Sequence, residues 1–313
     1  MSMYVPRKIL VTGSSGLIGS AITKYASSQN IDVLAHSRTN KLDFDNFQKM
    51  KKIYFDLRDS NEICFDANID TVIHTATSNE NKLASVEIAL QNTLVGTLNL
   101  LNKCVAQKVQ KFVYVSTVQL YTPKDGFINE FDEIEFESIY TKQHYLTEQL
   151  LRTYADKFEQ GINVLRVANV FSDSPYALSN RSNLVPTCFI KSGFELNKIS
   201  LLTNGAQKKN FIFDADVGKI SIITLPTEEM TFRIINVASM YTPTIIEIAK
   251  MVQQEFLLLD RRIEIEIEKD VFIDSKSLNF VSNFYEMPTW QMQQELMRES
   301  IKKLIELQIG QKI

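Results

Sequence analysis

Short apolar runs alternate with stretches of helical spacing along the first half of the chain. A run with no polar alternation is typical of a strand buried on both faces of a parallel sheet. Connections between such strands cross over with a right hand. The pattern predicts a doubly wound α/β fold (Rossmann type) whose strands lie near KILVT (8–12), IDVLAH (31–36), KIYF (52–55), TVIHTA (71–76) and FVYVS (112–116).

The pattern loosens in the second half. In order, we expect a helix over 138–160, a strand over 162–170, turns at 172–183 and 203–210, a helix over 242–256, a strand over 261–268 and a helix over about 290–308. This organisation predicts a dinucleotide-binding domain over 1–170, with its sheet completed by about 211–230. A smaller α/β substrate-binding lobe is expected over 171–210 and 231–313.

Composition excludes several classes of protein. The 313 residues are 44% hydrophobic and 23% charged, with a net charge of −3, which gives no electrostatic reason to expect nucleic acid or anionic membrane as partners. No apolar run is long enough to span a membrane, and the start does not resemble a signal peptide, so a cytoplasmic location is expected. The three cysteines are expected to be buried thiols, and with three scattered histidines no metal site is expected.

Three glycines follow the first predicted strand in TGSSGLIG. Gly13 permits a tight turn, Gly16 lets backbone approach a pyrophosphate, and Gly19 allows close packing of the following helix. The helix N-terminus then offers free N–H groups to phosphate. A packing turn is the simpler alternative, but the strand–turn–helix context predicts a dinucleotide site with contacts from Gly13, Ser15, Gly16, Leu17, Ile18 and Gly19.

The end of the second predicted strand bears on the choice of cofactor. An acid there would favour NAD, because it accepts hydrogen bonds from the ribose 2′-hydroxyl and repels a 2′-phosphate. This chain has AHSRTNK, with no acid before Asp43. Ser37 and Arg38 can donate to a phosphate, which favours NADP over NAD. The alternative is that Arg38 is a solvated surface charge.

Further motifs follow in a fixed order. They are FDLRD (55–59), DTVIHTAT (70–77), NTLVGTLNLL (92–101), KFVYVSTVQLY (111–121), YTKQHYLTE (140–148), LRVANVF (165–171) and NGAQKKNFIFDADV (204–217). With the glycine turn, they resemble the extended short-chain dehydrogenase/reductases of the NAD-dependent epimerase/dehydratase family, which act mostly on nucleotide sugars. The resemblance covers nearly the whole chain. It implies cofactor contacts from Asp56, Leu57, Thr75, Ala76, Thr77, Asn92, Tyr140 and His144, and substrate contacts from Thr117, Asn169 and Lys209. Arg181 in the turn-rich segment is a further candidate for a substrate contact.

The resemblance also implies a catalytic pair, Thr117 and Tyr140. In the family the tyrosine exchanges a proton with the substrate oxygen, and a lysine four residues later supports it and binds the nicotinamide ribose. This chain has His144 there, and Lys142 lies about 200° round the helix from Tyr140, on the far face. His144 can donate to ribose when neutral and support a phenolate when protonated. The alternative is a neutral scaffold beside a slow or inactive site.

Two residues that differ from the family's pattern reduce the number of reactions that the resemblance implies. Val118 and Gln119 stand where the family's 4,6-dehydratases have an Asp-Glu pair, which disfavours dehydration. With Ser37 and Arg38 the pattern favours an NADP-dependent reductase of a 4-keto sugar nucleotide. An epimerase with tightly bound NAD and a catalytically impaired, cofactor-sensing member are the alternatives. Many relatives dimerise through the long helices, here 80–107 and 138–160, so a homodimer is expected.

Overall fold

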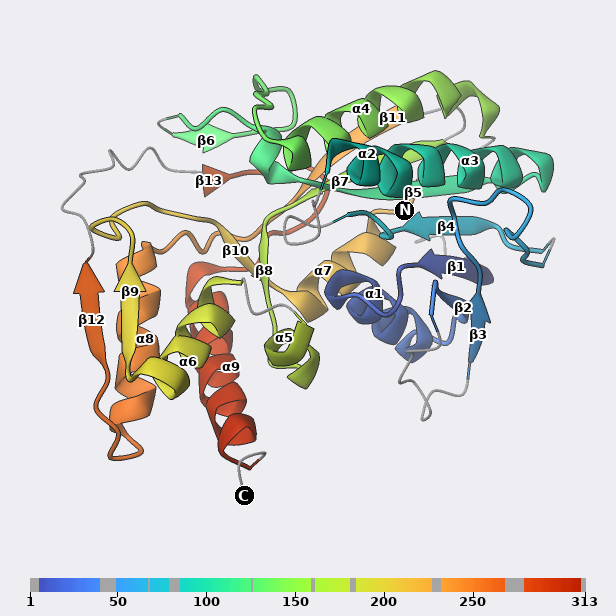
Figure 1. The fold of residues 1–313 in the computed structure, drawn as a ribbon. Coiled ribbons are helices and arrows are strands. Elements are labelled where there is room, and N and C mark those ends of the chain that lie inside the picture. The colour runs from blue at the N-terminus through green and yellow to red at the C-terminus, as the bar shows by residue number, and fades with distance from the viewer. Residues whose placement is uncertain are drawn as a thin grey trace.

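Seven parallel strands form one sheet in the part of the chain that the computed structural model describes (Figure 1). The described residues are 6–39, 49–66, 68–78, 85–124, 126–158, 161–180, 184–226, 232–267 and 279–310. From edge to edge the strands are β11 (Phe232–Val237), β7 (Ile162–Val167), β5 (Lys111–Thr117), β4 (Thr71–His74), β1 (Lys8–Thr12), β2 (Asp32–Ser37) and β3 (Met50–Tyr54). The predicted doubly wound α/β fold is confirmed.

The strand order changes direction between β1 and β4. Thr12 at the end of β1 lies in register with His74 at the end of β4, so the segments that follow both strands begin side by side. In open α/β sheets, ligands bind beyond the carboxyl ends of the strands at such a switch point. The glycine turn follows β1 and residues 75–78 follow β4, so both meet at this position.

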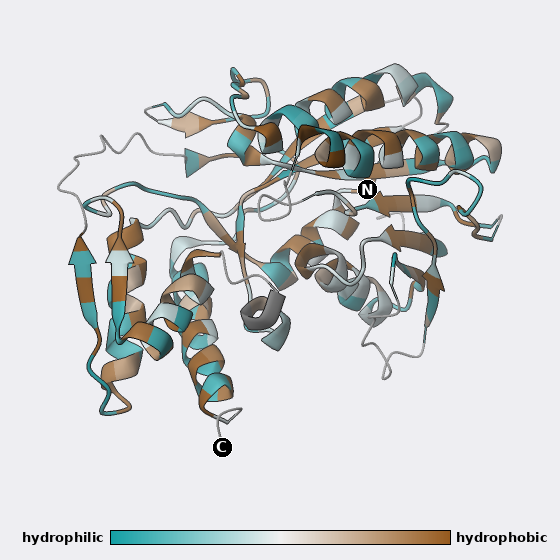
Figure 2. Ribbon diagram, in the orientation of Figure 1, coloured by the Kyte–Doolittle hydropathy of each residue, from teal (hydrophilic) through white to brown (hydrophobic). Residues whose placement is uncertain are grey.

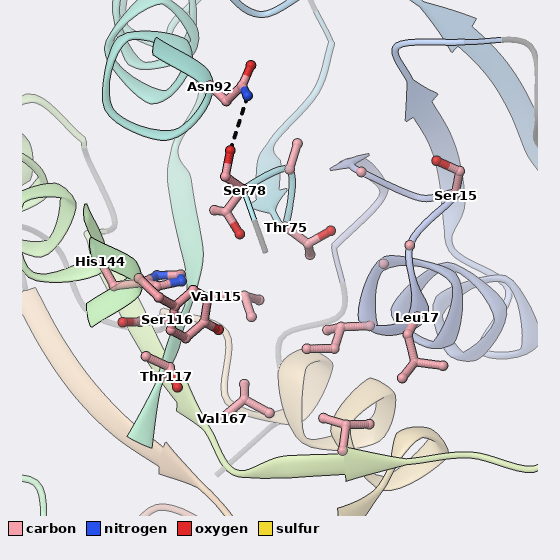
Figure 3. A pocket seen from close by; sticks show the side chains of 18 of the residues that line it. Ser15, Leu17, Thr75, Ser78, Asn92, Val115, Ser116, Thr117, His144 and Val167 are labelled. Carbon is pink, nitrogen blue, oxygen red and sulfur yellow. Dashed lines mark hydrogen bonds between the residues drawn. The ribbon is translucent and has the colours of Figure 1, made fainter. Parts of the chain in front are cut away.

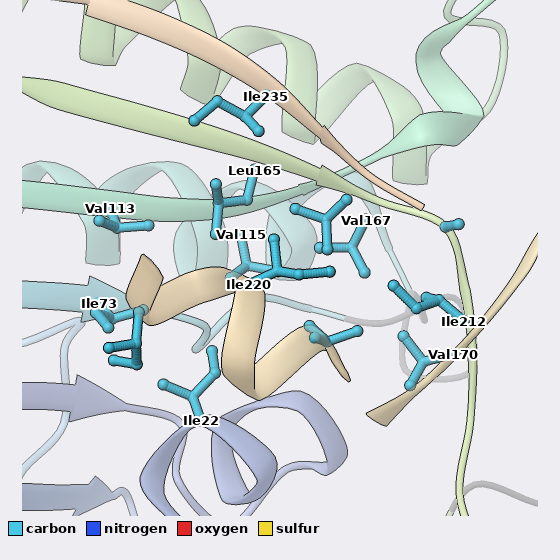
Figure 4. Close-up of a cluster of buried hydrophobic side chains, with 14 of the residues drawn as sticks. Ile22, Ile73, Val113, Val115, Leu165, Val167, Val170, Ile212, Ile220 and Ile235 are labelled. Carbon is cyan, nitrogen blue, oxygen red and sulfur yellow. The ribbon is translucent and has the colours of Figure 1, made fainter. Parts of the chain in front are cut away.

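Helices cover both faces of the sheet. One face carries α1 (Leu17–Ser28) and α7 (Asp214–Ile223), and the other carries α2 (Val86–Leu90), η2 (Gln91–Val95), α3 (Gly96–Ala106) and α4 (Ile139–Tyr154) (Figure 1). Successive residues of each buried strand serve opposite faces. Ile73 and Val113 therefore join Ile22 and Ile220 in one apolar cluster (Figure 4), while Val72 and Phe112 belong to the cluster under α3 and α4.

A third apolar cluster lies outside the main sheet, on the side of the molecule where hydrophobic faces of several helices turn inward (Figure 2). Its members include Phe194, Ile248 and Leu304. The cluster is built from α6 (Val185–Leu196), β9 (Lys198–Leu201), α8 (Ile245–Leu257), β12 (Glu264–Ile267) and α9 (Trp290–Gly310). The predicted division into a cofactor domain and a substrate lobe stays a prediction.

The chain leaves the main sheet at Ala168, the single residue between β7 and β8 (Asn169–Phe171). After Ala168, β8 pairs with β10 (Phe211–Phe213) in a separate two-stranded sheet. The one strand expected over 162–170 is therefore two. The remaining short elements are η3 (Val118–Leu120), β6 (Phe127–Ile128), η4 (Ala155–Lys157), α5 (Pro175–Asn180) and β13 (Asn279–Phe280).

Three other expectations need correction. The segment 172–183 contains a short helix, α5, where only turns were expected. The described part of the long helix 80–107 is interrupted by a π-helical turn, η2. Cys104 is buried, but Cys64 and Cys188 are exposed, because Cys64 lies in the turn-rich stretch after β3 and Cys188 faces outward from α6. Within the described ranges, no helix is both long and apolar enough to cross a bilayer.

Candidate active site

A cavity of about 750 Å³ opens at the switch point of the sheet. Every residue that the sequence predicted for the site lines it, except Arg181, which lies outside the described residues. Figure 3 shows Ser15 and Leu17 of the glycine turn on one side of this space and His144 and Thr117 on the other. Residues far apart in the sequence therefore share one cavity.

The glycine turn has no room for side chains at two of its three glycines. Gly13 has φ of 72°, and a Cβ there would lie 2.9 Å from the backbone nitrogen of Ala76. A Cβ on Gly19 would overlap the carbonyl oxygen of Gly13, so this glycine lets the helix pack against the turn itself. A Cβ on Gly16 would meet only the Gly13 carbonyl, at 3.2 Å, and otherwise point into open space. These contacts fit a turn that brings backbone close to a dinucleotide pyrophosphate.

Polar and basic side chains line the end of the cavity beyond β2. The hydroxyls of Ser15 and Ser37 lie 3.0 Å apart, and Arg38 beside them is exposed. Across from them, the Arg58 guanidinium donates to the Asp56 carboxylate at 2.5 Å and holds the pKa of Asp56 below its usual value. Sequence reasoning missed Arg58, although it stands in the FDLRD motif.

His36 also lines the end of the cavity beyond β2. It is buried, its ring stacks on Phe55 with centroids 3.9 Å apart, and its Nε2–H donates to the Phe55 carbonyl at 2.9 Å. Burial lowers the pKa of His36 to about 4, so the ring is neutral near pH 7. A lone histidine at a strand end belongs to no motif, so its place in the site is not predictable from the sequence.

A buried chain of hydrogen bonds begins at the end of β1. The His74 ring, fully buried, bonds Thr12 Oγ1 through Nδ1 at 2.6 Å and Thr97 Oγ1 through Nε2 at 2.9 Å. The Thr97 hydroxyl donates its proton to the Thr93 carbonyl, so the His74 Nε2 must carry a hydrogen. Burial lowers the pKa of His74 to about 3. These hydrogen bonds join β1, the strand before the glycine turn, to α3 and η2.

Further hydrogen bonds connect η2 to α4. The Thr93 hydroxyl donates to Gln143 Oε1 at 2.9 Å, and Gln143 Nε2 donates to the Ser78 carbonyl at 2.7 Å. Asn92 Nδ2 donates to the Ser78 hydroxyl at 3.1 Å, shown by the dashed line in Figure 3. Gln143 precedes His144 and was missed in sequence reasoning, because no motif letter marks it. The segment after β4 is thereby fixed to the helix that carries Tyr140.

Tyr140 and His144 lie one turn apart on α4. Their rings meet edge to face with centroids 4.8 Å apart. His144 is 2% exposed; its Nδ1 bonds the Tyr114 hydroxyl at 2.8 Å, and its Nε2 has no hydrogen-bond partner among the described residues. Burial lowers the pKa of His144 to about 3. Of the two roles considered for His144, donor when neutral and support of a phenolate when protonated, burial therefore favours the neutral donor near pH 7.

Thr117 ends β5 on the floor of the cavity. It is buried, and its hydroxyl accepts from the Gln119 backbone N–H at 3.2 Å. Val118 is buried while Gln119 is exposed and lines the cavity, so one neutral amide stands where an acid pair would have been. Lys142 is exposed, as the helix geometry predicted.

A buried ion pair lies beneath the Thr117–Tyr140 region. Arg166 on β7 donates through NH2 to Glu148 Oε2 at 2.7 Å, and the two side chains are 3% and 2% exposed. The Ser116 hydroxyl donates to the other Glu148 oxygen at 2.6 Å. The pair ties α4 to β5 and β7, and so fixes the helix that carries Tyr140.

Asn169, the first residue of β8, and Lys209, just before β10, both line the cavity. Asn169 Nδ2 donates to the Asn210 carbonyl at 2.8 Å, and the Lys209 side chain is exposed. Asn210 is buried and donates to the Ser239 carbonyl at 2.7 Å. Asn210 is therefore a structural crosslink between the segment before β10 and the segment after β11.

Fold and site define a dinucleotide-binding α/β protein with a threonine–tyrosine pair at the open end of its cofactor cavity. The model of the NAD dependent epimerase/dehydratase family matches residues 9–238, and the chain belongs to this family.

Relatives of known identity fall into more than one reaction class. The chain is 26% identical over 267 residues to dTDP-4-dehydro-6-deoxy-D-allose reductase of Streptomyces bikiniensis, covering 80% of this chain and 81% of that protein. It is 27% identical over 286 residues to dTDP-D-glucose 4,6-dehydratase of Mus musculus, covering 86% and 77%. The solved structure of MoeE5 in complex with UDP-glucose and NAD matches with a TM-score of 0.75 and 19% identity, over 98% of this chain and 100% of that one. That likeness confirms the fold.

Proposed function

We propose that this protein is an NADP(H)-dependent reductase of a 4-keto nucleotide sugar. A 4-keto-6-deoxy-hexose nucleotide is the substrate that we expect. The observation that carries the proposal is the neutral, buried His144 beside Tyr140. In this family a lysine ammonium at that position favours a phenolate. A neutral imidazole adds no positive charge, so it favours the reaction in which the tyrosine acts as a proton donor, which is ketone reduction.

The residues divide the work of that reaction. When bound, the cofactor supplies the hydride. The Thr117 hydroxyl polarises the substrate carbonyl, and Tyr140 gives its proton to the carbonyl oxygen, which becomes the product hydroxyl. Solvent then returns a proton to Tyr140. Asn169 and Lys209 would hold the sugar nucleotide, with Lys209 giving a point charge to its diphosphate.

The choice of NADP rests on the β2 end of the cavity. Ser15, Ser37 and Arg38 line it together with Asp56, whose carboxylate lies close enough to Arg38 to interact with it electrostatically. Asp56 is already paired with Arg58, which reduces its repulsion of a 2′-phosphate. We expect Arg38→Ala to weaken NADPH binding about tenfold and to leave NADH binding unchanged, measured by nucleotide fluorescence. Arg262→Ala, an exposed arginine of the lobe, is the control.

Activity is tested by mixing the purified protein with NADPH and 4-keto nucleotide sugars and following the loss of NADPH absorbance. Tyr140→Phe should lower turnover by about 100-fold or more, because the proton donor is gone. Tyr154→Phe is the matched control, since its hydroxyl donates to Asn102 outside the cavity. Absence of turnover by the wild type, or full turnover by Tyr140→Phe, would contradict the proposal.

Two other functions predict different results. An epimerase would release tightly bound NAD when the purified protein is denatured. A catalytically impaired, cofactor-sensing member would bind NADP but no nucleotide sugar, and His144→Lys would create strong activity in a silent wild type. Val118 and Gln119 argue against a dehydratase, as before.

We also propose that the protein is a homodimer. Apolar side chains are exposed on the neighbouring helices of one face: Val86, Ile88 and Val95 on α2 and η2, and Leu146 on α4. A second copy packed on these helices would cover them. Light scattering should show a dimer for the wild type and a monomer for Leu146→Arg. A monomeric wild type overturns this proposal. The cytoplasmic location stays a prediction.

A further inference from the structure

Tyr114 is a buried tyrosine whose hydroxyl contacts His144, the histidine of the candidate site. It lies on β5 and is 0% exposed, and its hydroxyl is 2.8 Å from His144 Nδ1. The two rings have centroids 5.8 Å apart. The opposite nitrogen, Nε2, has no partner among the described residues, and His144 lines the cavity. Tyr114 therefore contacts one imidazole nitrogen, and the other is buried without a partner in a residue that lines the cavity.

The position of one proton decides what His144 offers to a ligand. A neutral imidazole has a single N–H. If Tyr114 donates to Nδ1, the hydrogen is on Nε2 and the cavity meets a donor. If Nδ1–H donates to the Tyr114 oxygen, Nε2 is a bare acceptor. The hydrogen bond between Tyr114 and His144 therefore sets the chemistry of the opposite nitrogen.

Two acceptors stand near the Tyr114 hydroxyl proton: His144 Nδ1 and the Thr147 hydroxyl. The Thr147 hydroxyl already donates to the Gln143 carbonyl at 2.8 Å, so it can only accept. An imidazole nitrogen is a far stronger hydrogen-bond acceptor than an alcohol oxygen, so the Tyr114 hydroxyl donates its hydrogen bond to Nδ1 in preference. The hydrogen of His144 is then on Nε2.

We propose that Tyr114 is a positioning residue that holds His144 as the Nε2–H form and fixes its ring. The imidazole thereby presents a hydrogen-bond donor where relatives carry a lysine ammonium, and the ligand group it takes is a hydroxyl oxygen, that of the cofactor ribose. An ammonium has three rotatable donors and needs no such partner. This inference rests on the proposed function for the identity of the ligand, but not for the position of the proton.

Nitrogen-15 NMR of the histidine rings reads that proton directly, without any activity. The chain has only three histidines. His36 and His74 also carry their hydrogen on Nε2, because the first donates to a carbonyl and the second to a threonine hydroxyl that is itself a donor. The His144→Gln variant assigns the remaining signals. We expect Nδ1 of His144 to be the unprotonated, hydrogen-bonded nitrogen, and Tyr114→Phe to move that resonance while leaving those of His36 and His74 in place.

A binding cycle tests the functional part. Tyr114→Phe should weaken NADPH binding about fivefold, measured by fluorescence titration. In a His144→Gln background, where an amide donor has no tautomers, the same change should alter binding less than about twofold. His144→Lys is a second background, in case the glutamine variant folds poorly. Tyr154→Phe is the control on α4, and circular dichroism checks folding throughout.

The outcomes separate the two proposals. A protonated Nδ1 in the wild type, or equal effects of Tyr114→Phe in both backgrounds, overturns the role of Tyr114. Failure of the wild type to bind NADPH overturns the proposed function, while the NMR result still decides where the proton is.

Discussion

The two ends of the cavity are built on different principles. At the glycine turn, backbone atoms set the shape, and the missing side chains of Gly13 and Gly19 are the essential feature. At the tyrosine end, side chains of α4 set the shape through hydrogen bonds: Gln143 donates to the Ser78 carbonyl after β4, and His144 and Glu148 bond Tyr114 and Ser116 of β5. The glycine turn therefore depends on steric space, whereas the tyrosine end depends on where a few protons and charges are held.

The comparison also indicates which end tolerates change. A backbone cradle fails when any atom is added, but it does not depend on pH. A buried polar framework accepts replacements of similar shape, yet it responds to every lost charge or proton. The predictions below test each end, beginning with the largest effect.

Gly13→Ala should abolish dinucleotide binding, with a loss of about 100-fold or more. The new methyl would meet Thr75 Oγ1 at 2.8 Å and Ala76 N at 2.9 Å, and φ is 72°. Gly126→Ala is a matched control, because its φ is 85° but nothing lies within 4 Å of the added Cβ. Titration calorimetry with NADP measures the binding. Similar losses in both variants would show that φ alone, and not the cradle, is responsible.

Glu148→Gln should lower the free energy of unfolding by about 3–5 kcal/mol, because it leaves the Arg166 guanidinium buried without its counter-charge. The control is Glu195→Gln, which removes an exposed pair with Lys191 whose side chains are 52% and 57% exposed. That change should cost no more than about 0.5 kcal/mol. Urea unfolding measures both, and equal values would contradict the buried framework.

Stability should fall as pH drops from 7 to 5. Burial lowers the pKa of His144 and of His74 to about 3 and that of His36 to about 4, while each titrates near 6.5 when unfolded. Because the unfolded chain takes up these protons first, each histidine contributes a loss of about 2 kcal/mol over this range.

One group acts in the opposite direction. Burial raises the pKa of Asp214 to about 6, so the folded state takes up a proton there and offsets part of the loss. His144→Gln should remove about 2 kcal/mol of the pH effect, as seen by urea unfolding at pH 7 and 5. An unchanged pH dependence would mean that His144 is not buried as a neutral ring.

Lys142→Ala should have the smallest effect. The side chain is exposed and faces away from the cavity, so turnover should stay within about twofold and stability within about 0.5 kcal/mol. Steady-state kinetics beside the wild type checks this. A loss comparable to that of Tyr140→Phe would mean that Lys142 supplies the missing cation after all.

The sequence predicted the framework well where one local rule decides the structure. The strand KILVT was predicted with the bounds that β1 has, and the glycine turn with its steric roles. A helix was expected over 242–256, and α8 begins three residues later, at Ile245, because Thr244 caps it and its side chain accepts from Glu247 in a capping box. Each of these depends only on residues close together in the chain.

The partners of the site were harder to predict because they meet only in the folded state. No motif letter marks the role of Gln143 or Tyr114, and their contacts span 65 and 30 positions in the chain. The neutrality of His144 follows from burial, which a helix pattern does not measure. Likewise, the split of the strand at Ala168 follows from pairing with β10, a segment far along the sequence.

The π-helical turn η2 gives the long helix two phases. Before it, Val86 and Ile88 of α2 are exposed; after it, Leu100, Leu101 and Cys104 of α3 are buried against the sheet. A wide turn holds one residue more than an α-helical path, and each residue advances a helix by about 100°. Deleting one residue within 91–95 would therefore rotate α2 away from its present outward direction without touching α3. The rotation of α2 about its own axis is thus set by η2, and not by the packing of α3 against the sheet.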